Sequence, residues 1–183
     1  QAGAVLRSLV TDPRWGPEAR ILYAQALRMS GKPDEAHEVL AAREAPRRPE
    51  LLFELAATTS LSDRSGPRMS VLEELLAGPE PYASAARSYR ALELLNTGEV
   101  DHARQDVNAV VTTLLDAPAE DLRDVLEAVS AAAWCAYMLD DFRGAISLAE
   151  RGLRIARRFG RATPQPNLNC ALAFALIQVG RLD

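Results

Sequence analysis

The sequence predicts an all-α fold, a right-handed array of antiparallel helix pairs that pack against their neighbours. Ala and Leu are the commonest residues of a chain that is 48% hydrophobic and only 5% aromatic, and both are strong helix formers. Apolar residues recur at helical spacing, whereas no alternating pattern long enough for a strand appears. Proline-bearing loops separate the helical runs, because proline cannot continue a helix interior.

The first helix pair is expected over residues 17–44. Gly31 interrupts the apolar pattern and suits the left-handed residue that commonly follows a helix. Pro33 then opens the second helix, with the carboxylates of Asp34 and Glu35 near its positive end. The two helices are therefore expected to be joined by a short turn.

The same layout returns at residues 83–115 and 119–159. Gly98 marks the turn of the first of these pairs, and Asp140 stands where glycine is expected in the second. We interpret the following Asp141 as the N-terminal cap of the next helix, rather than as one of two paired catalytic carboxylates.

The remaining helical runs depart from this layout. A pair without the turn markers is expected over residues 49–77, with its turn at residues 62–66. The chain ends in half a pair at residues 165–183, where Gly180 marks a turn that no second helix follows. This last helix is apolar nearly all round, which is typical of a helix covered on several sides. We therefore expect residues 1–183 to be a single repeat domain cut from a longer protein, which hides this helix by forming a homodimer.

A small residue precedes each turn marker by seven positions. Where two helices cross closely, only a small side chain fits, so these positions are expected at the crossings. They are Ala24, Ala91, Ala133 and Ala173.

This arrangement of markers resembles the tetratricopeptide repeat family. A glycine, four further residues and an alanine occur at 31–36 and again at 98–103. More narrowly, residues 132–183 resemble the repeat regions of large LuxR-type, MalT-like transcription regulators. In those regulators an ATPase domain precedes the repeats and a helix-turn-helix domain follows them.

The resemblance implies a sensing and interaction domain of a bacterial transcriptional regulator. Such a domain binds a small-molecule inducer or a protein partner, and contacts DNA only through another domain that is not in this sequence. The alternative is a general protein–protein adaptor unrelated to transcription.

The resemblance also implies that the first helix of each pair lines a concave groove. Trp134, Tyr137 and Phe174 are large anchors beside polar groups, a composition typical of binding surfaces. The alternative is that these rings fill the core. The expected groove residues are Ile21, Gln25, Arg28, Ser88, Leu92, Asn96, Glu127, Trp134, Tyr137, Asn167, Phe174 and Gln178.

No catalytic, cofactor or metal site is predicted. Gly31 precedes a lysine but lacks the upstream glycine of a phosphate-binding loop. His37 and His102 have polar neighbours in sequence and are expected to face solvent rather than a metal. Cys135 and Cys170 lie in apolar runs and are expected to be buried, reduced thiols, which fits a cytoplasmic location.

Charge and hydropathy limit the classes of partner that this chain is expected to bind. The net charge of −4 argues against a nucleic-acid surface, and the longest apolar stretch, residues 128–139, is too short to span a membrane. A cluster of arginines either binds an anion or an acidic partner or, as we favour, complements the negative end of its own helix before Gly160. Its members are Arg151, Arg154, Arg157, Arg158 and Arg161.

Overall fold

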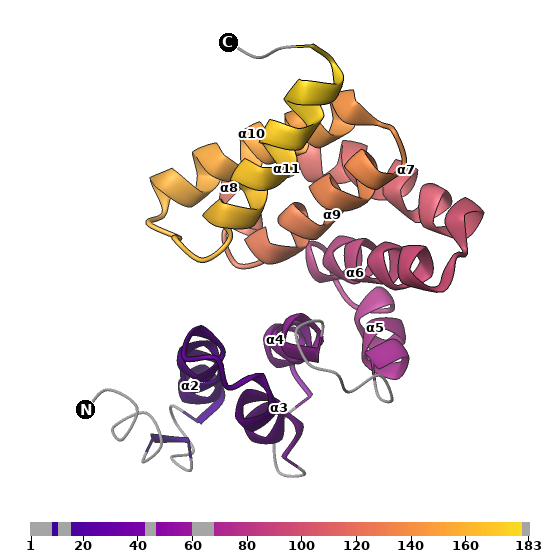
Figure 1. The fold of residues 1–183 in the computed structure, drawn as a ribbon. Helices are drawn as coiled ribbons and strands as arrows, with labels where there is room; N and C mark the ends of the chain where they lie inside the picture. The colour runs from indigo at the N-terminus through magenta and orange to yellow at the C-terminus, as the bar shows by residue number, and fades with distance from the viewer. Residues whose placement is uncertain (1–8, 11–15, 43–46, 60–67, 181–183) are drawn as a thin grey trace. The chain divides into compact units, whose positions relative to one another are not determined.

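The computed structural model describes residues 9–10, 16–42, 47–59 and 68–180. These residues contain helices and no strand, so the all-α prediction is confirmed (Figure 1). The turn expected at residues 62–66 and the ends expected at 43–44 and 181–183 lie outside the described residues. The helices are α2 (Gly16–Met29), α3 (Pro33–Ala41), α4 (Pro49–Thr59), α5 (Arg68–Leu76), α6 (Tyr82–Thr97), α7 (Val100–Asp116), α8 (Ala119–Leu122), α9 (Leu126–Met138), α10 (Phe142–Arg158) and α11 (Gln165–Gln178).

The chain divides into two compact units, residues 1–78 and 79–183. In the first unit, consecutive helices from α2 to α5 pack against each other, and α4 also packs against α2. The boundary falls between the second and third expected helix pairs. The expectation of a single domain stays a prediction.

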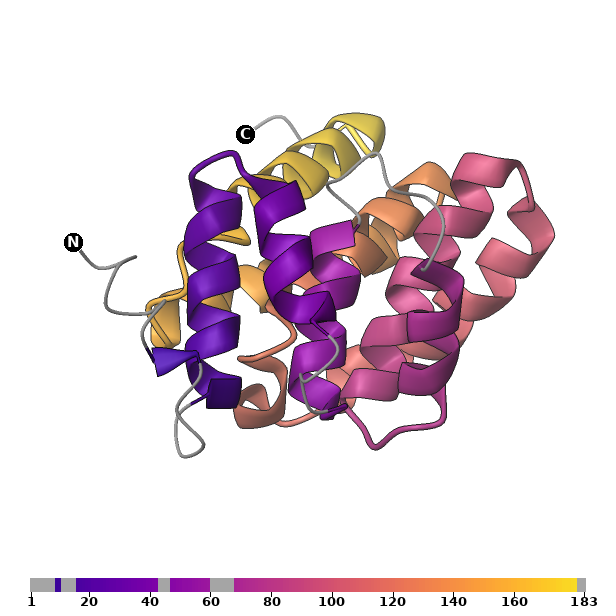
Figure 2. The same ribbon diagram turned by 90° about the horizontal axis from the view of Figure 1, so that it is seen from below.

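The second unit contains the pairs α6–α7 and α9–α10, followed by α11. Helix α9 packs against α6, α7, α10 and α11, while α11 lies along both α9 and α10 (Figures 1 and 2). Small side chains such as Ala91, Cys135, Ala136 and Ala145 make up much of the core where these helices meet. The first helix of the pair expected at 119–159 is interrupted, because the short α8 precedes α9.

All four turn markers adopt the left-handed conformation that the sequence predicts. The backbone angle φ is 73° at Gly31, 83° at Gly98, 64° at Asp140 and 73° at Gly180. Asp140 is the only non-glycine residue with positive φ in the described part of the chain. Asp141 caps α10 as expected, since its carboxylate accepts a hydrogen bond of 2.9 Å from the Gly144 N–H.

The small residues before the markers follow the prediction in three cases out of four. Ala24, Ala91 and Ala133 are fully buried, as expected for positions where helices cross closely. Ala173 on α11 is exposed instead. Helix α11 turns Ala171 and Ala175 toward its neighbours. Ala173 lies two residues from each of them, which places it about half a turn away on the opposite side of the helix, so the expectation for Ala173 was wrong.

Two further expectations are also wrong. Cys170 is exposed, because it lies on the side of α11 away from the buried Leu168 and Ala171. His37 is buried rather than solvent-facing, because α3 turns it to the same side as the buried Ala36 and Leu40. His102 is exposed, as expected.

Candidate binding surface

The expected groove residues of the first unit lie on α2 and do not form an open surface. Arg28 forms an ion pair of 2.7 Å with Glu54 of α4, and the two side chains are only 6% and 4% exposed. The Gln25 amide donates a hydrogen bond of 3.0 Å to the other carboxylate oxygen of Glu54. Gln25 and Arg28 therefore join α2 to α4 instead of standing free in a groove.

Sequence reasoning missed Glu54, although a signal was present. Glu54 is the only charged residue in the apolar run from Leu51 to Ala57. A charge at such a position is stable only with a partner, because burying an unpaired carboxylate costs several kcal/mol or more. The run alone does not say which cation supplies that partner.

In the second unit, the residues expected on α6 lie in different surroundings. Ser88 is fully buried, and its hydroxyl donates a hydrogen bond of 2.9 Å to the Ser84 carbonyl, so the expectation that it lines an open groove was wrong. Leu92 is half-buried against the core. Asn96 is exposed near the end of the helix.

The aromatic residues expected in the groove do come together. Trp134 and Tyr137 of α9 and Phe174 of α11 contact one another, with ring centroids 5.7 to 5.9 Å apart. Tyr137 also lies 5.9 Å from the Phe142 ring at the start of α10. We call Trp134, Tyr137, Phe142 and Phe174 the aromatic cluster. These separations are typical of packed aromatic pairs.

The aromatic cluster is partly core and partly surface. Tyr137 and Phe142 pack against the buried residues between α6, α9 and α10. Trp134 is half-buried, and Phe174 is 46% exposed. Within the described part of the chain, neither the Trp134 indole N–H nor the Tyr137 hydroxyl has a hydrogen-bond partner.

Other exposed residues follow these aromatic residues along α9 and α11. Met138 follows Tyr137 at the end of α9, while Ile177 and Gln178 lie three and four residues after Phe174, on the same side of α11. All three are exposed. We call Trp134, Tyr137, Met138, Phe174, Ile177 and Gln178 the α9–α11 face. Of the other expected groove residues, Asn167 is exposed near the start of α11 and Glu127 is half-buried in the first turn of α9.

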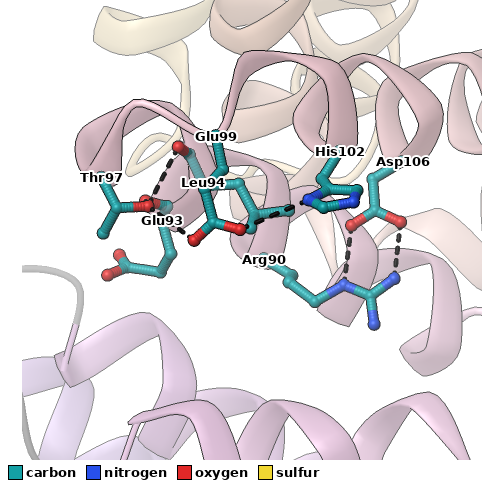
Figure 3. A network of polar contacts seen from close by, with 7 residues as sticks. All are labelled: Arg90, Glu93, Leu94, Thr97, Glu99, His102 and Asp106. Atoms are coloured by element: carbon teal, nitrogen blue, oxygen red, sulfur yellow. Dashed lines mark hydrogen bonds and ion pairs between the residues drawn. The ribbon is translucent and has the colours of Figure 1, made fainter.

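A polar network joins α6 to α7 (Figure 3). The Arg90 guanidinium donates hydrogen bonds of 2.7 and 2.6 Å to the two carboxylate oxygens of Asp106. Nearer the turn, Glu99 lies 3.3 Å from the Thr97 hydroxyl and 3.3 Å from the exposed ring of His102. This network stabilises the helix pair. Its only histidine, His102, is exposed and contacts a single carboxylate, that of Glu99.

Three members of the arginine cluster, on α10 and just after it, bind other groups of the second unit. Arg151 donates hydrogen bonds to the carbonyls of Leu114, at 3.1 Å, and Ala117. It therefore complements the C-terminus of α7 rather than that of its own helix. Arg158 pairs with Glu120 at 2.6 Å, and Arg161 pairs with Asp124 at 2.7 Å.

The remaining chemistry-bearing groups stand apart from one another. Burial raises the pKa of the Cys135 thiol to about 12, so that this thiol is protonated and unreactive at neutral pH. Among the described residues, no cluster of three His, Cys, Asp or Glu side chains is placed to hold a metal ion. Within the same part of the chain, no helix combines the length and hydrophobicity needed to cross a membrane.

No protein-family model, curated protein or solved structure shows a significant match to this chain.

Proposed function

We propose that this chain is a tetratricopeptide-like repeat module, an α-solenoid, that binds a protein partner through the α9–α11 face. The observation that carries the proposal is the aromatic cluster, in which a half-exposed phenylalanine lies between a tryptophan and a tyrosine. Trp and Tyr are enriched among the residues that dominate binding energy in protein interfaces. Isolated exposed apolar residues are common on any surface, but contiguous rings are not.

The packing order of the helices supports the repeat architecture. In the first unit α2 packs against both α3 and α4, and in the second unit α9 packs against both α10 and α11, as expected when each pair packs on its neighbour. A residue with left-handed backbone conformation occurs at each turn that carries a marker. Repetition of one turn and one packing order is how stacked helix pairs are built.

The polar tips of the cluster indicate what a partner supplies. The Trp134 N–H is a donor only, and the Tyr137 hydroxyl both donates and accepts. A partner that covers Phe174 removes water from these tips and must then offer acceptors, such as backbone carbonyls or carboxylates. A protein segment with apolar side chains and accessible carbonyls meets both needs.

The spacing of the rings favours a protein partner over a small inducer at this face. Rings whose centroids lie less than 6 Å apart are in direct contact. They leave no space for a ligand between them. Binding on top of the rings instead suits an extended or helical segment.

The transcriptional role rests on the resemblance of residues 132–183 to regulator repeats. We propose that the chain is the sensing region of such a regulator and that DNA is contacted through another domain. A chromosomal Phe174→Ala allele tests this role by RNA sequencing. A regulator predicts altered transcript levels for a defined set of genes, whereas the general adaptor predicts none beyond those of a matched Met29→Ala allele.

Selection from a random-peptide library tests the binding surface. Peptides enriched on the wild-type chain should bind it with a Kd in the micromolar range and lose about tenfold in affinity to Phe174→Ala, since truncating a central aromatic contact costs 1 to 2 kcal/mol or more. Met29→Ala, at an exposed apolar residue of α2, is the matched control. Failure to enrich any sequence, or equal binding to both variants, would exclude this face.

We propose a second use for the exposed part of α11. Cys170, Ala173 and Ile177 are exposed along one side of this helix, and a second copy of the chain that covered them would form a homodimer. This proposal retains the self-association that the apolar sequence of α11 predicts.

A further inference from the structure

A small cavity opens between the start of α6, the end of α7 and the short α8. Its volume is about 150 Å³, and all of its lining residues belong to the second unit. None of them is part of the α9–α11 face. A cavity of this size accommodates a ligand about as large as benzene.

The cavity has an apolar floor and acidic walls. Leu114 and Leu122 are fully buried on the floor. Glu80 and Asp121 add two exposed carboxylates to the lining. Within the described residues, neither carboxylate forms an ion pair.

Ser84 supplies a third polar group. It lines the cavity, is only 1% exposed, and its hydroxyl has no hydrogen-bond partner in the described part of the chain. Leaving a buried hydroxyl unsatisfied costs about 1 to 3 kcal/mol. One turn later, Ser88 satisfies its own hydroxyl by donating to the Ser84 carbonyl. The Ser84 hydroxyl is therefore a buried polar group that the described residues leave unsatisfied beside the cavity.

The charges around the cavity exclude an anion. At the start of α6, the Ser84 N–H already donates a hydrogen bond of 3.2 Å to the Glu80 carboxylate, so a helix terminus that would attract an anion is occupied by a negative charge. The nearby Arg151 is engaged by the Ala117 carbonyl. Arg123, which follows the lining residue Leu122, is paired with Asp124 at 3.0 Å. Because both nearby guanidinium groups are engaged, the carboxylates of Glu80 and Asp121 leave the site attractive to a cation.

We propose that this cavity binds a primary alkylammonium group. An ammonium has three donors and no acceptor, and these donors match the carboxylates of Glu80 and Asp121 together with the Ser84 hydroxyl as acceptors. The alkyl part covers Pro81, Ala117 and Pro118, the apolar lining residues that remain partly exposed, where burial of apolar surface is favourable. A free amine and the lysine side chain of a partner protein both present this chemistry.

Titration of the intact chain with n-butylammonium chloride, followed by ¹H–¹⁵N NMR, tests the site. We expect saturable shifts of the Ser84 and Leu122 amides at millimolar ligand, with 1-butanol weaker by about tenfold and butyrate not binding, because a charge-assisted hydrogen bond contributes about 1.5 kcal/mol or more. Absence of saturable shifts, or equal affinity for 1-butanol, overturns the proposal.

Variants locate the charge that binds the ammonium. Glu80→Gln and Asp121→Asn keep the size of each side chain and should each weaken n-butylammonium binding by about three- to tenfold. Glu150→Gln, which removes an exposed carboxylate from α10 outside the lining, is the control and should leave affinity unchanged. Equal loss in all three variants would reduce the effect to overall charge and overturn the site.

A lysine mimic separates the two sources of the ligand. Nα-acetyl-lysine methylamide should shift the same amides if a partner's lysine side chain enters the cavity. If only n-butylammonium produces these shifts, the site takes free amines. Both outcomes retain the alkylammonium site, and binding by neither compound refutes it.

Discussion

Arg90 of α6 and Asp106 of α7 face each other across the first helix pair of the second unit and share two hydrogen bonds of 2.7 and 2.6 Å (Figure 3). The Asp106 side chain is 9% exposed and that of Arg90 is 33% exposed. Two parallel bonds between planar groups fix an orientation as well as a distance. The pair therefore sets how α6 lies against α7, and α9 packs on both helices.

Asp106→Ala should destabilise the chain measurably. The change removes both hydrogen bonds and leaves a half-buried guanidinium without this partner, so we expect the free energy of unfolding to fall by about 1.5 to 3 kcal/mol. Urea unfolding followed by circular dichroism measures the difference. The control is Glu99→Gln, which weakens an exposed contact with His102 and should cost less than about 0.5 kcal/mol. Similar losses in both variants would contradict a special role for Arg90–Asp106.

The turn markers can be tested by exchange between pairs. No atom lies within 4 Å of a Cβ built on Gly98, so Gly98→Ala meets only the backbone penalty of a left-handed residue, about 1 to 2 kcal/mol. Gly98→Asp should cost less, because Asp140 already occupies the equivalent turn with φ of 64° and aspartate tolerates this conformation better than alanine. A lower thermal unfolding temperature for Gly98→Asp than for Gly98→Ala would contradict this interpretation.

The two thiols should differ in reactivity and in their effect on stability. At pH 8 an alkylating reagent should modify Cys170 and spare Cys135 in the folded chain, because Cys170 is exposed and Cys135 is buried. Mass spectrometry of the digested product identifies the modified residue. Modification of both thiols at equal rates would show that the core around Cys135 opens readily.

Cys135 also predicts a loss of stability in alkali. Its pKa is raised in the folded state from 9.0 to about 12, so the unfolded chain ionises first. The contribution of the protonated Cys135 thiol to the free energy of unfolding is fully present below pH 9 and is lost as the pH rises toward 12. The denaturation midpoint in urea should therefore fall between pH 8 and pH 10.5 less steeply in Cys135→Ala than in the wild type, while Cys170→Ser retains the wild-type slope. Parallel slopes for the wild type and Cys135→Ala would contradict the shift.

Self-association through α11 should depend on Ile177. Ile177→Glu places a charge on the exposed side of the helix, which an apolar interface does not tolerate. Sedimentation velocity should show a dimer in the wild type and in the control Met29→Glu, and a monomer in Ile177→Glu. A wild-type chain that remains monomeric at high concentration would refute the homodimer.

Local features of the fold could be predicted from the sequence because each depends on neighbouring residues. Gly31 and Gly98 mark turns through their own backbone freedom, and Asp141 caps a helix whose first N–H groups lie within its reach. The pairing of Arg28 with Glu54 could not be predicted, because residues 26 positions apart meet only once α2 packs on α4.

The candidate binding surface was predicted in part for the same reason. Turn-marker alignment placed Trp134, Tyr137 and Phe174 on first helices, and the structure brings their rings together. The same alignment failed for Ser88. An alignment gives the position of a residue along its helix, but it does not say which residues a neighbouring helix covers. The unsatisfied Ser84 hydroxyl left no sequence signal, since serine is common both at exposed and at buried helical positions.

Phe174→Ala is the best variant for testing the α9–α11 face. Phe174 is half-exposed and lies at the outer side of the aromatic cluster. Tyr137 contacts three other rings and packs against the core, so Tyr137→Ala would change stability and binding together. Tyr137→Phe removes only the hydroxyl and should weaken binding without lowering the unfolding temperature.

Fluorescence of Trp134 reports directly on partner binding at this face. Trp15→Phe leaves Trp134 as the sole tryptophan, and its emission can be followed while a library-selected peptide is added. We expect a saturable change in emission whose midpoint equals the Kd of the selected peptide. When the chain also carries Phe174→Ala, the peptide concentration at the midpoint should be about tenfold higher. A peptide that binds while Trp134 emission stays constant, or that binds the Phe174→Ala variant equally well, would contradict binding at the α9–α11 face.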